Sequence, residues 1–330
     1  MALERGFVLA ALILMSLTAA TAAQQADALP APESFRDSDA STFVGRWAVT
    51  AETLILDRSA SGGQRLLTDP IPNAELFNAS DLRFPMAAGP RLSLRRQGVL
   101  DGELEVVYFG IDGFQSTASF PNSALPSTVA GLSIDDAIVT PVDSALFQYD
   151  SRLYNFELNY RKQVRERLTL LAGFRWVELE DRYVATGIED ANMSLFTDAV
   201  RGHNHLYGFQ IGCDAKLRAP EKLFQIDALA KAGVYGNAVG LTNDYADTVR
   251  SYSASSSSGH VAFVGELGLM ASYRLSDHLS ARVGYQLLWL DGVAVGPEQI
   301  SSTDFLSGSA AFKPGTAFYH GANVGLEFQW

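Results

Sequence analysis

The chain has 330 residues, of which 47% are hydrophobic, and its formal net charge is −12. With 25 Lys and Arg against 37 Asp and Glu, it lacks the basic excess that a nucleic-acid partner requires. Its single cysteine, Cys213, excludes an intramolecular disulfide and a multi-cysteine metal site. After the amino terminus, no stretch approaches the ~20 apolar residues of a membrane-spanning helix.

Residues 1–23 have the pattern of a secretory signal peptide, in which Arg5 precedes the apolar run 7–17 and small residues follow. The alternative, a membrane anchor, is disfavoured because this run is shorter than the ~17 residues that a spanning helix needs. We therefore expect an exported protein. Residues 24–42, rich in Ala, Pro, Asp and Ser, are expected to be a mobile lead-in to one domain over 43–330.

Ten strands are predicted from runs in which every second residue is apolar. Most of these runs exceed the ~9–11 residues that a membrane-spanning strand needs. They are also about twice the ~5–6 residues typical of a soluble sheet. The predicted strands are 43–57, 88–97, 102–115, 147–162, 167–182, 203–218, 222–235, 260–274, 277–290 and 316–330.

The connections between these strands alternate in length. Short turns lie at 98–101, at 163–166, at Pro220 and at Ser276, whereas the others are long: 58–87, 116–146, 183–202, 236–259 and 291–315. Outer-membrane barrels have short periplasmic turns, long outer loops and an even number of strands. The sequence therefore predicts an all-β fold, a single-chain transmembrane antiparallel up-and-down β-barrel of about ten strands.

The last strand shows the pattern most clearly. Phe318, Ala322, Val324, Leu326, Phe328 and Trp330 alternate with small or polar residues. One face suits hydrocarbon and the other a polar interior. We expect this strand to close the barrel on the first strand, and to be the element through which the barrel-assembly machinery recognises the chain. Outer-membrane lipid is the second expected partner.

On the predicted inward faces, eight acids and eight bases face the lumen. A charge in a narrow lumen loses water, which costs several kcal/mol unless the charge is paired. Equal numbers of both signs therefore predict a structural network of ion pairs, with an ion or proton path as the alternative. The set is Glu52, Arg91, Arg95, Glu103, Glu105, Glu157, Arg161, Arg175, Asp214, Lys216, Asp227, Lys231, Glu266, Arg274, Arg282 and Glu327.

Candidate chemistry is sparse. His203 and His205 lie on one face of a strand near a rim, with Asp198 nearby, and could bind metal or support hydrolysis. No third ligand is evident, so we assign no catalytic, cofactor-binding or metal-binding residue and expect no cofactor. The acidic long loops could hold divalent cations, although such charge more often keeps loops solvated. The Ser-rich stretch 253–258 is expected to be a flexible loop.

Two long loops carry apolar residues and are predicted to fold over or into the mouth: 116–146 with Phe120, and 291–315 with Ile300 and Phe305. Ten strands leave an interior only slightly wider than the filled eight-stranded case. We therefore expect a structural or narrow passive-channel role. The alternatives are surface adhesion through these two loops and a rim-located hydrolase near the two histidines.

Four stretches resemble a family of uncharacterised outer-membrane β-barrels that are numerous in planctomycete-type bacteria. They are Trp47 to Arg58, Gly89-Pro90-Arg91, Glu105 to Gly110 and Leu171 to Arg175, and the resemblance runs from about residue 43 to the carboxyl terminus. It implies an exported outer-membrane barrel without an assigned substrate. It also implies that Glu52, Arg91, Glu105 and Arg175 belong to a structural network in the lumen.

Overall fold

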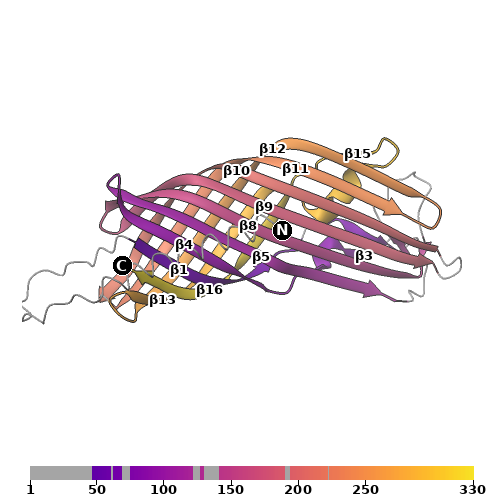
Figure 1. Ribbon diagram of the computed structural model, residues 1–330. Coiled ribbons are helices and arrows are strands. Elements are labelled where there is room, and N and C mark those ends of the chain that lie inside the picture. The colour runs from indigo at the N-terminus through magenta and orange to yellow at the C-terminus, as the bar shows by residue number, and fades with distance from the viewer. Residues whose placement is uncertain are drawn as a thin grey trace, which may run out of the picture. The chain divides into compact units, whose positions relative to one another are not determined.

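The computed structural model describes residues 47–60, 62–68, 75–121, 127–129, 141–189, 194–221 and 223–330. In these residues ten long antiparallel strands follow one another in chain order around a ring (Figure 1). The predicted signal peptide and lead-in lie outside the described residues. The strands are β1 (Trp47–Arg58), β4 (Ala87–Val99), β5 (Gly102–Phe120), β8 (Ser144–Arg165), β9 (Leu168–Glu189), β10 (Ser194–Glu221), β11 (Phe224–Ala246), β12 (Ser251–Arg274), β13 (Leu279–Val293) and β16 (Gly315–Gln329).

The ring closes between the first and the last of these strands. β1 pairs with β16 from Ala48 opposite Gln329 to Arg58 opposite Tyr319. Beyond this ladder, the backbone N of Trp47 donates to Trp330 O (3.1 Å), and Trp330 N donates to Trp47 O (3.0 Å). The additional pairing of β11 with β12 completes the circle. The predicted contact between the first and last strands is confirmed.

Four short turns lie at the end of the barrel where β16 finishes, and we call this the turn end. The turn from β4 to β5 consists of Leu100 and Asp101, both at positive φ (49° and 59°). This conformation matches the right-handed twist of a two-residue hairpin. The opposite end, which carries the other connections, is the loop end.

Two connections at the loop end are much shorter than predicted. β9 extends to Glu189 and β10 already begins at Ser194. Likewise, β11 extends to Ala246 and β12 begins at Ser251. The predicted loops 183–202 and 236–259 are therefore wrong, and the Ser-rich stretch 253–258 is part of β12 rather than a flexible loop. These strands extend beyond the segments in which every second residue is apolar. Their outward residues become polar there, while the backbone hydrogen bonds between strands continue.

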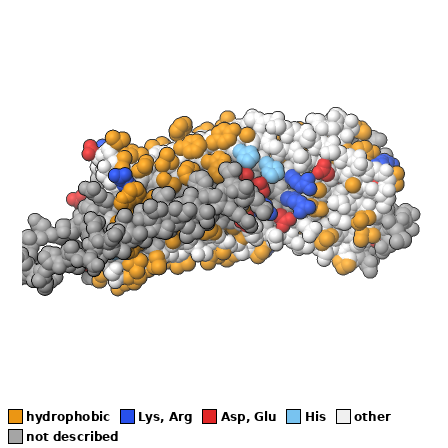
Figure 2. Space-filling model, in the orientation of Figure 1, with side chains coloured by type: hydrophobic (Ala, Val, Ile, Leu, Met, Phe, Trp, Pro, Cys, Tyr) orange, Lys and Arg blue, Asp and Glu red, His pale blue; other side chains and the backbone are white. Residues whose placement is uncertain are grey.

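The outward face near the turn end is apolar. Figure 2 shows hydrophobic side chains gathered over this half of the visible surface. We call this surface the apolar belt; its exposed members include Phe209, Ile211, Val234, Val261, Leu267, Leu269, Val283, Val324 and Leu326. Val324 and Leu326 belong to the face of the last strand that was predicted to suit hydrocarbon. Within the described residues, no helix is both long and apolar enough to cross a membrane.

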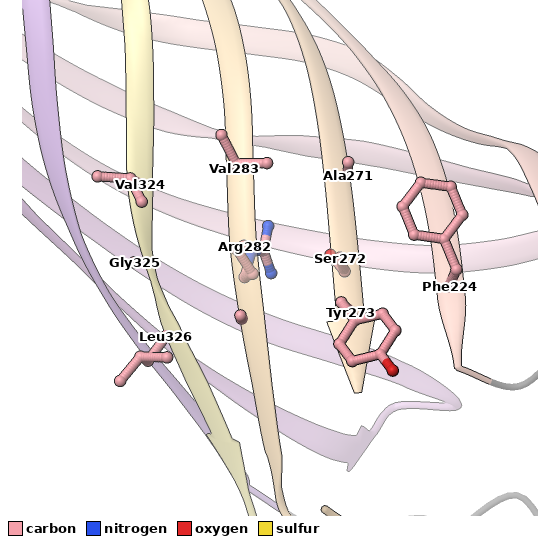
Figure 3. Close-up of a pocket in the computed structure, with 10 residues that line it drawn as sticks. Phe224, Ala271, Ser272, Tyr273, Arg282, Val283, Val324, Gly325 and Leu326 are labelled. Carbon is pink, nitrogen blue, oxygen red and sulfur yellow. The ribbon is translucent and has the colours of Figure 1, made fainter. Parts of the chain in front are cut away.

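A shallow groove of about 500 Å³ lies on the belt between Phe224 and Leu326. Figure 3 shows Val283 and Val324 on its outer side, while the Arg282 side chain lies behind the strand. Arg282 forms ion pairs with lumen carboxylates. Neighbouring side chains of one strand thus face the lipid and the lumen in turn, as two-residue alternation requires.

Short elements fill the interior at the loop end, and we call their described residues, 62–68, 75–86 and 294–314, the plug. Leu66, Leu82, Phe84 and Ile300 are buried against inward-facing strand residues. The plug contains β2 (Arg65–Thr68), β3 (Glu75–Asn78), η1 (Ala79–Asp81), η2 (Gly296–Ser302), β14 (Thr303–Asp304) and β15 (Ser309–Ala310); β2 also pairs with β6 (Ser127–Val129), which pairs with β7 (Pro141–Val142).

Two glycines allow β16 to approach β1 at the closing seam. A Cβ atom at Gly321 would lie 2.0 Å from Ile55 O, and one at Gly325 would lie 2.1 Å from Ala51 O. We expect the double change of Gly321 and Gly325 to Ala to impair barrel closure, because backbone atoms must move in both strands. The loss of the fast-migrating, heat-modifiable form in unheated gel samples measures this effect.

Gly259→Ala is the matched control, because no atom lies within 4 Å of a Cβ at that strand glycine. It is expected to migrate like the unmodified chain. A double variant that folds as completely as this control would contradict the proposed steric limit at the seam.

Candidate functional site: the charged lumen and its plug

Four oppositely charged side chains meet in the lumen at the level of the apolar belt, and we call them the central cluster: Glu157 of β8, Arg175 of β9, Lys231 of β11 and Glu266 of β12. Lys231 Nζ lies 2.9 Å from Glu157 Oε2 and 3.5 Å from Glu266 Oε1. Arg175 Nη1 lies 2.9 Å from Glu266 Oε2, and its Nε lies 3.8 Å from Glu157 Oε1. Each base thus lies between both acids.

Register explains part of this arrangement. Glu157 is directly opposite Arg175 in the β8–β9 ladder, and Lys231 is directly opposite Glu266 in the β11–β12 ladder. The contacts between Arg175 and Glu266, and between Lys231 and Glu157, instead join strands that are not adjacent. The central cluster therefore ties together two hairpins around the ring.

Amide side chains add hydrogen bonds to the cluster. Gln210 Nε2 donates to Glu157 Oε2 and to Asn159 Oδ1, both at 2.8 Å. Asn155 Oδ1 accepts from Arg175 Nε at 2.6 Å. These three amides were not predicted as lumen residues, because only charged residues were considered on the inward faces. Their inward positions on predicted strands were the signal that could have identified them.

Two further groups of ion pairs lie beside the central cluster. In one, Arg161 contacts Glu105 (3.1 Å) and Asp214 (2.8 Å). In the other, Glu327 accepts from both Arg95 (2.5 Å) and Arg282.

The predicted pairing of lumen charges is confirmed for most of the set. Glu52 joins the network through Arg282 (3.2 Å) and Arg91 (3.8 Å). Three members differ. Asp227 accepts from Gln225 Nε2, whereas Lys216 and Arg274 form no ion pair among the described residues.

The lumen is filled at this level. Glu157, Asn155 and Asn159 have 0% exposed surface, and Arg175 has 1%. A continuous aqueous path past these side chains would leave water-accessible surface on its walls. The described side chains of the central cluster are therefore shielded from solvent at the level of the belt.

A second cross-lumen contact lies closer to the loop end. Both terminal nitrogens of Arg58 donate to Asp181, at 3.0 and 2.8 Å, and Tyr149 OH donates to Asp181 Oδ2 at 2.5 Å. The Arg58 guanidinium also lies 4.9 Å from the ring centre of Phe84, a plug residue. Gly296 N of η2 donates to Asp181 Oδ2 at 3.3 Å. This bridge joins β1, β9 and the plug.

Asparagine side chains hold the start of the 294–314 segment of the plug. Asn204 Oδ1 accepts from Ala294 N (2.7 Å), and Asn204 Nδ2 donates to Ala294 O (3.0 Å). Asn237 Nδ2 donates to Gly292 O (3.1 Å). Because these bonds satisfy buried backbone groups, the segment can enter the barrel without leaving unpaired peptide atoms at this point. The prediction that 291–315 folds into the mouth is confirmed for its described residues.

The predicted neighbourhood of Asp198 and the two histidines is wrong. His203 and His205 face outward, where their Nδ1 atoms lie 3.5 Å from Glu180 Oε1 and 3.8 Å from Glu178 Oε1. Asp198 is buried inside, as expected for a residue at an odd spacing from both along one strand. Within the described residues, no group of three or more His, Cys, Asp or Glu side chains is arranged to hold a metal ion.

Asp198 lies at the loop end, beyond the apolar belt, and is 1% exposed with no hydrogen-bond partner for Oδ1. Burial, with a smaller contribution from Asp244, raises the pKa of Asp198 from its ordinary value of 3.8 to about 7. Burial and the nearby Asp198 also raise the pKa of Tyr183. The site favours the neutral carboxylic acid, because an ionised group there would have no counter-ion.

The outward apolar belt, the inward charges and the ring of strands agree with what family comparison shows. A family model described as "Putative beta barrel porin-7 (BBP7)" matches residues 144–330, which is more than half of the chain. The chain belongs to this family. It is accordingly a porin-like outer-membrane β-barrel with transmembrane strands, and the predicted resemblance to an uncharacterised outer-membrane β-barrel family is confirmed over residues 144–330.

Solved barrels resemble the chain at low identity. They include the outer-membrane protease OmpT from Escherichia coli (10% identity, 86% of this chain, 96% of that chain, TM-score 0.46). The translocator domain of the autotransporter NalP from Neisseria meningitidis is 10% identical, with 87% of this chain and 89% of that chain covered and a TM-score of 0.40. The Pseudomonas putida toluene transporter TodX is 10% identical, with 87% of this chain and 90% of that chain covered and a TM-score of 0.34. No curated protein matches the chain.

The central cluster predicts a large cost for removing one charge. Lys231→Met leaves Glu157 and Glu266 sharing one base in a site without water, so we expect the free energy of unfolding to fall by about 3–5 kcal/mol. Urea unfolding in lipid vesicles, followed by tryptophan fluorescence, measures the change.

Arg65→Met is the matched control, because Arg65 and Glu75 form an exposed pair at 3.8 Å. Its cost should stay within about 1 kcal/mol. Equal costs for the two variants would show that the lumen charges are not desolvated.

The buried Asp198 predicts stability that falls with rising pH. Because its pKa is raised in the folded state, the stabilisation is complete below pH 3.8 and is lost as the pH rises to about 7. The size is on the order of 1.4 kcal/mol per pKa unit. We expect Asp198→Asn to abolish this slope, which hydrogen exchange of η2 and β11 between acidic and neutral pH would measure.

Asp277→Asn, at an exposed turn, provides the comparison and should leave the slope unchanged. A slope that survives Asp198→Asn would assign the titration to another group.

Proposed function

We propose that this porin-like barrel has a structural role in the outer membrane and that its lumen is closed at rest. The central cluster carries this proposal, because its charges are paired and buried across the lumen at the level of the belt. The plug adds a second barrier at the loop end. Both barriers oppose a wide, permanently open pore.

The energy of the cluster limits passive flow. Separating one buried pair costs about 3–5 kcal/mol, and each ~1.4 kcal/mol lowers the population of the opened state about tenfold. Openings that break a single pair are therefore rare, with populations of roughly one in a hundred to one in several thousand. The narrow passive-channel role is confined to water or small ions during such openings.

Surface adhesion through the two apolar loops is less well supported than plugging. Ile300 and Phe305 are buried, and Phe120 packs against Phe77 and Phe147. These apolar side chains are used inside the barrel and do not form an exposed adhesive patch. The other apolar residues predicted in 116–146 lie largely outside the described residues.

We also propose that the chain is not an enzyme. The predicted rim site required His203 and His205 to act with a carboxylate facing a substrate pocket. Instead the two imidazoles face outward beside Glu180 and Glu178, and Asp198 lies on the other side of the wall. The family description, which names a barrel porin, agrees with this proposal.

The orientation and partners are proposed from the same architecture. Short turns lie on the periplasmic side of outer-membrane barrels, so we place the loop end at the cell exterior. Export through a signal peptide over 1–23 and assembly through the strand that ends at Trp330 remain predictions from the sequence. Lipid is the partner expected around the apolar belt.

Planar-bilayer recording tests the closed lumen. We expect no stepwise current from the unmodified chain, and none when 296–313 is replaced by a short Gly-Ser linker, because the central cluster still fills the lumen. An open porin in the same bilayers is the positive control, and heat-modifiable migration verifies folding.

Porin-sized current steps from the unmodified chain would overturn the proposal. Steps seen only in the plug-deleted variant would show that the plug, rather than the central cluster, is the barrier.

A further inference from the structure

Beyond the belt, the outer wall of the barrel is charged on one side. We call this surface the charged facet; it spans β8, β9 and β10. Figure 2 shows histidine and charged side chains gathered at the border between the hydrophobic half and the largely uncharged half. By register, its outward residues are Asp150, Arg152, Glu178, Glu180, Arg182, Arg201, His203 and His205.

The level of the facet is set by the belt. Glu178 and His205 lie one two-residue step beyond the outward residues Trp176 and Tyr207. At ~3.3 Å per residue along a tilted strand, each such step rises by about 5 Å. The polar headgroup region of a bilayer adds roughly 5–7 Å on each side of the hydrocarbon. The first rows of the facet therefore lie where lipid headgroups lie.

The arginines of the facet are accessible. Among the described residues Arg152 forms one ion pair, with Glu180 at 3.7 Å, and its side chain is 57% exposed. Arg201 contacts Asp244 at 3.1 Å and is 42% exposed. Exposed ion pairs of this kind are weak and are readily exchanged for a stronger partner. Both guanidinium groups can therefore accept a ligand from outside the barrel.

Two of the arginines face each other. Arg182 is directly opposite Arg201 in the β9–β10 ladder, and both point outward. Like charges at directly opposite positions of a sheet destabilise the pair. Within the described residues, Arg182 forms no ion pair, although Asp150 lies directly opposite it in the β8–β9 ladder. An anion between the two guanidinium groups would remove the repulsion.

The neighbouring wall at the same level has no such character. By register, the outward residues of β11 and β12 are small and uncharged, apart from Asp244, which pairs with Arg201: they are Ala238, Gly240, Thr242, Gly259, Ser257 and Ser255. Two sides of one barrel, exposed to the same solvent, thus differ in charge. Solvation alone explains polar residues on both sides but does not explain three arginines on one.

We propose that the charged facet binds the phosphate-bearing headgroup of an outer-leaflet lipid. Guanidinium groups bind phosphate through paired, charge-assisted hydrogen bonds. A lipid with its acyl chains on the apolar belt presents its headgroup to Arg152, which lies one two-residue step beyond the outward residue Tyr154. Arg182 and Arg201 lie one row further out, about 10 Å beyond Tyr154, and contact only the outer part of a large headgroup. Glu178 and Glu180 position the histidines and Arg152. The assignment to the outer leaflet rests on the proposed orientation of the loop end. Headgroup binding itself does not depend on that orientation.

The test measures lipid retention. The barrel is reconstituted in phosphatidylcholine vesicles that contain diphosphoryl lipid A, extracted in mild detergent, and analysed for bound lipid A by native mass spectrometry. The facet variant changes Arg152, Arg182 and Arg201 to Gln. We expect it to retain roughly tenfold less lipid A than the unmodified chain, since it loses several charged hydrogen bonds.

The control variant changes Arg65, Arg83 and Arg250 to Gln, three exposed arginines of the loop end outside the facet. It removes the same charge and should retain lipid A like the unmodified chain. Heat-modifiable migration confirms that both variants fold. Lipid A without phosphate groups should show no preference for the unmodified chain over the facet variant.

Equal retention by the facet and control variants would overturn the proposal, as would equal retention of the dephosphorylated lipid. Displacement of lipid A by inorganic phosphate at equal concentration would identify a general anion site, which also contradicts lipid recognition. A cysteine at Ser255, labelled from outside intact cells, tests the orientation separately. Lipid retention without labelling would overturn the outer-leaflet assignment and leave headgroup binding intact.

Discussion

The burial of the lumen charges is the constraint on which the structure depends. Glu157 and Arg175 are almost completely buried, so each needs an opposite charge at close range. Lys231 and Glu266 satisfy this need from strands on another hairpin. The same contacts that neutralise the charges therefore fix the width of the ring. A wider barrel would separate the pairs, and a narrower one would not hold the amides between them.

Much of this arrangement follows from sequence, because alternation and hairpin turns determine which residues share a face and which are opposite. Once the short turn at 163–166 is placed, Glu157 is opposite Arg175. The pairing of Lys231 with Glu266 instead spans a hairpin whose connection lies at the loop end, where the predicted loop 236–259 was wrong. The contact of Arg58 with Asp181 could not be predicted in this way. It joins β1 to β9 across the lumen, and it depends on how the ring curves.

The loop end was the least predictable part, for two physical reasons. Strands such as β12 continue beyond the belt with Ser and Gly facing water, so the apolar alternation that identifies a strand disappears while the ladder persists. In addition, the segment 58–87 contributes Leu66 and Phe84 to the interior. Its short apolar runs resemble those of a surface loop until the surrounding wall supplies an apolar face to cover them.

Toward the loop end the outer face of the wall becomes polar, while the inner face becomes more apolar around the buried Asp181, Asp198 and Asn204. Along β9, the inward residues change from Arg175 to the buried Val177 and Leu179, while the outward residues change from Trp176 to Glu178. Where lipid surrounds the wall, the polar residues must turn inward and be paired. Where water surrounds it, polar residues can face out, and an apolar interior requires something to fill it. The plug is thus the counterpart of the central cluster. The central cluster fills the lumen with charged residues where lipid surrounds the wall, and the plug fills it with apolar residues where water surrounds the wall.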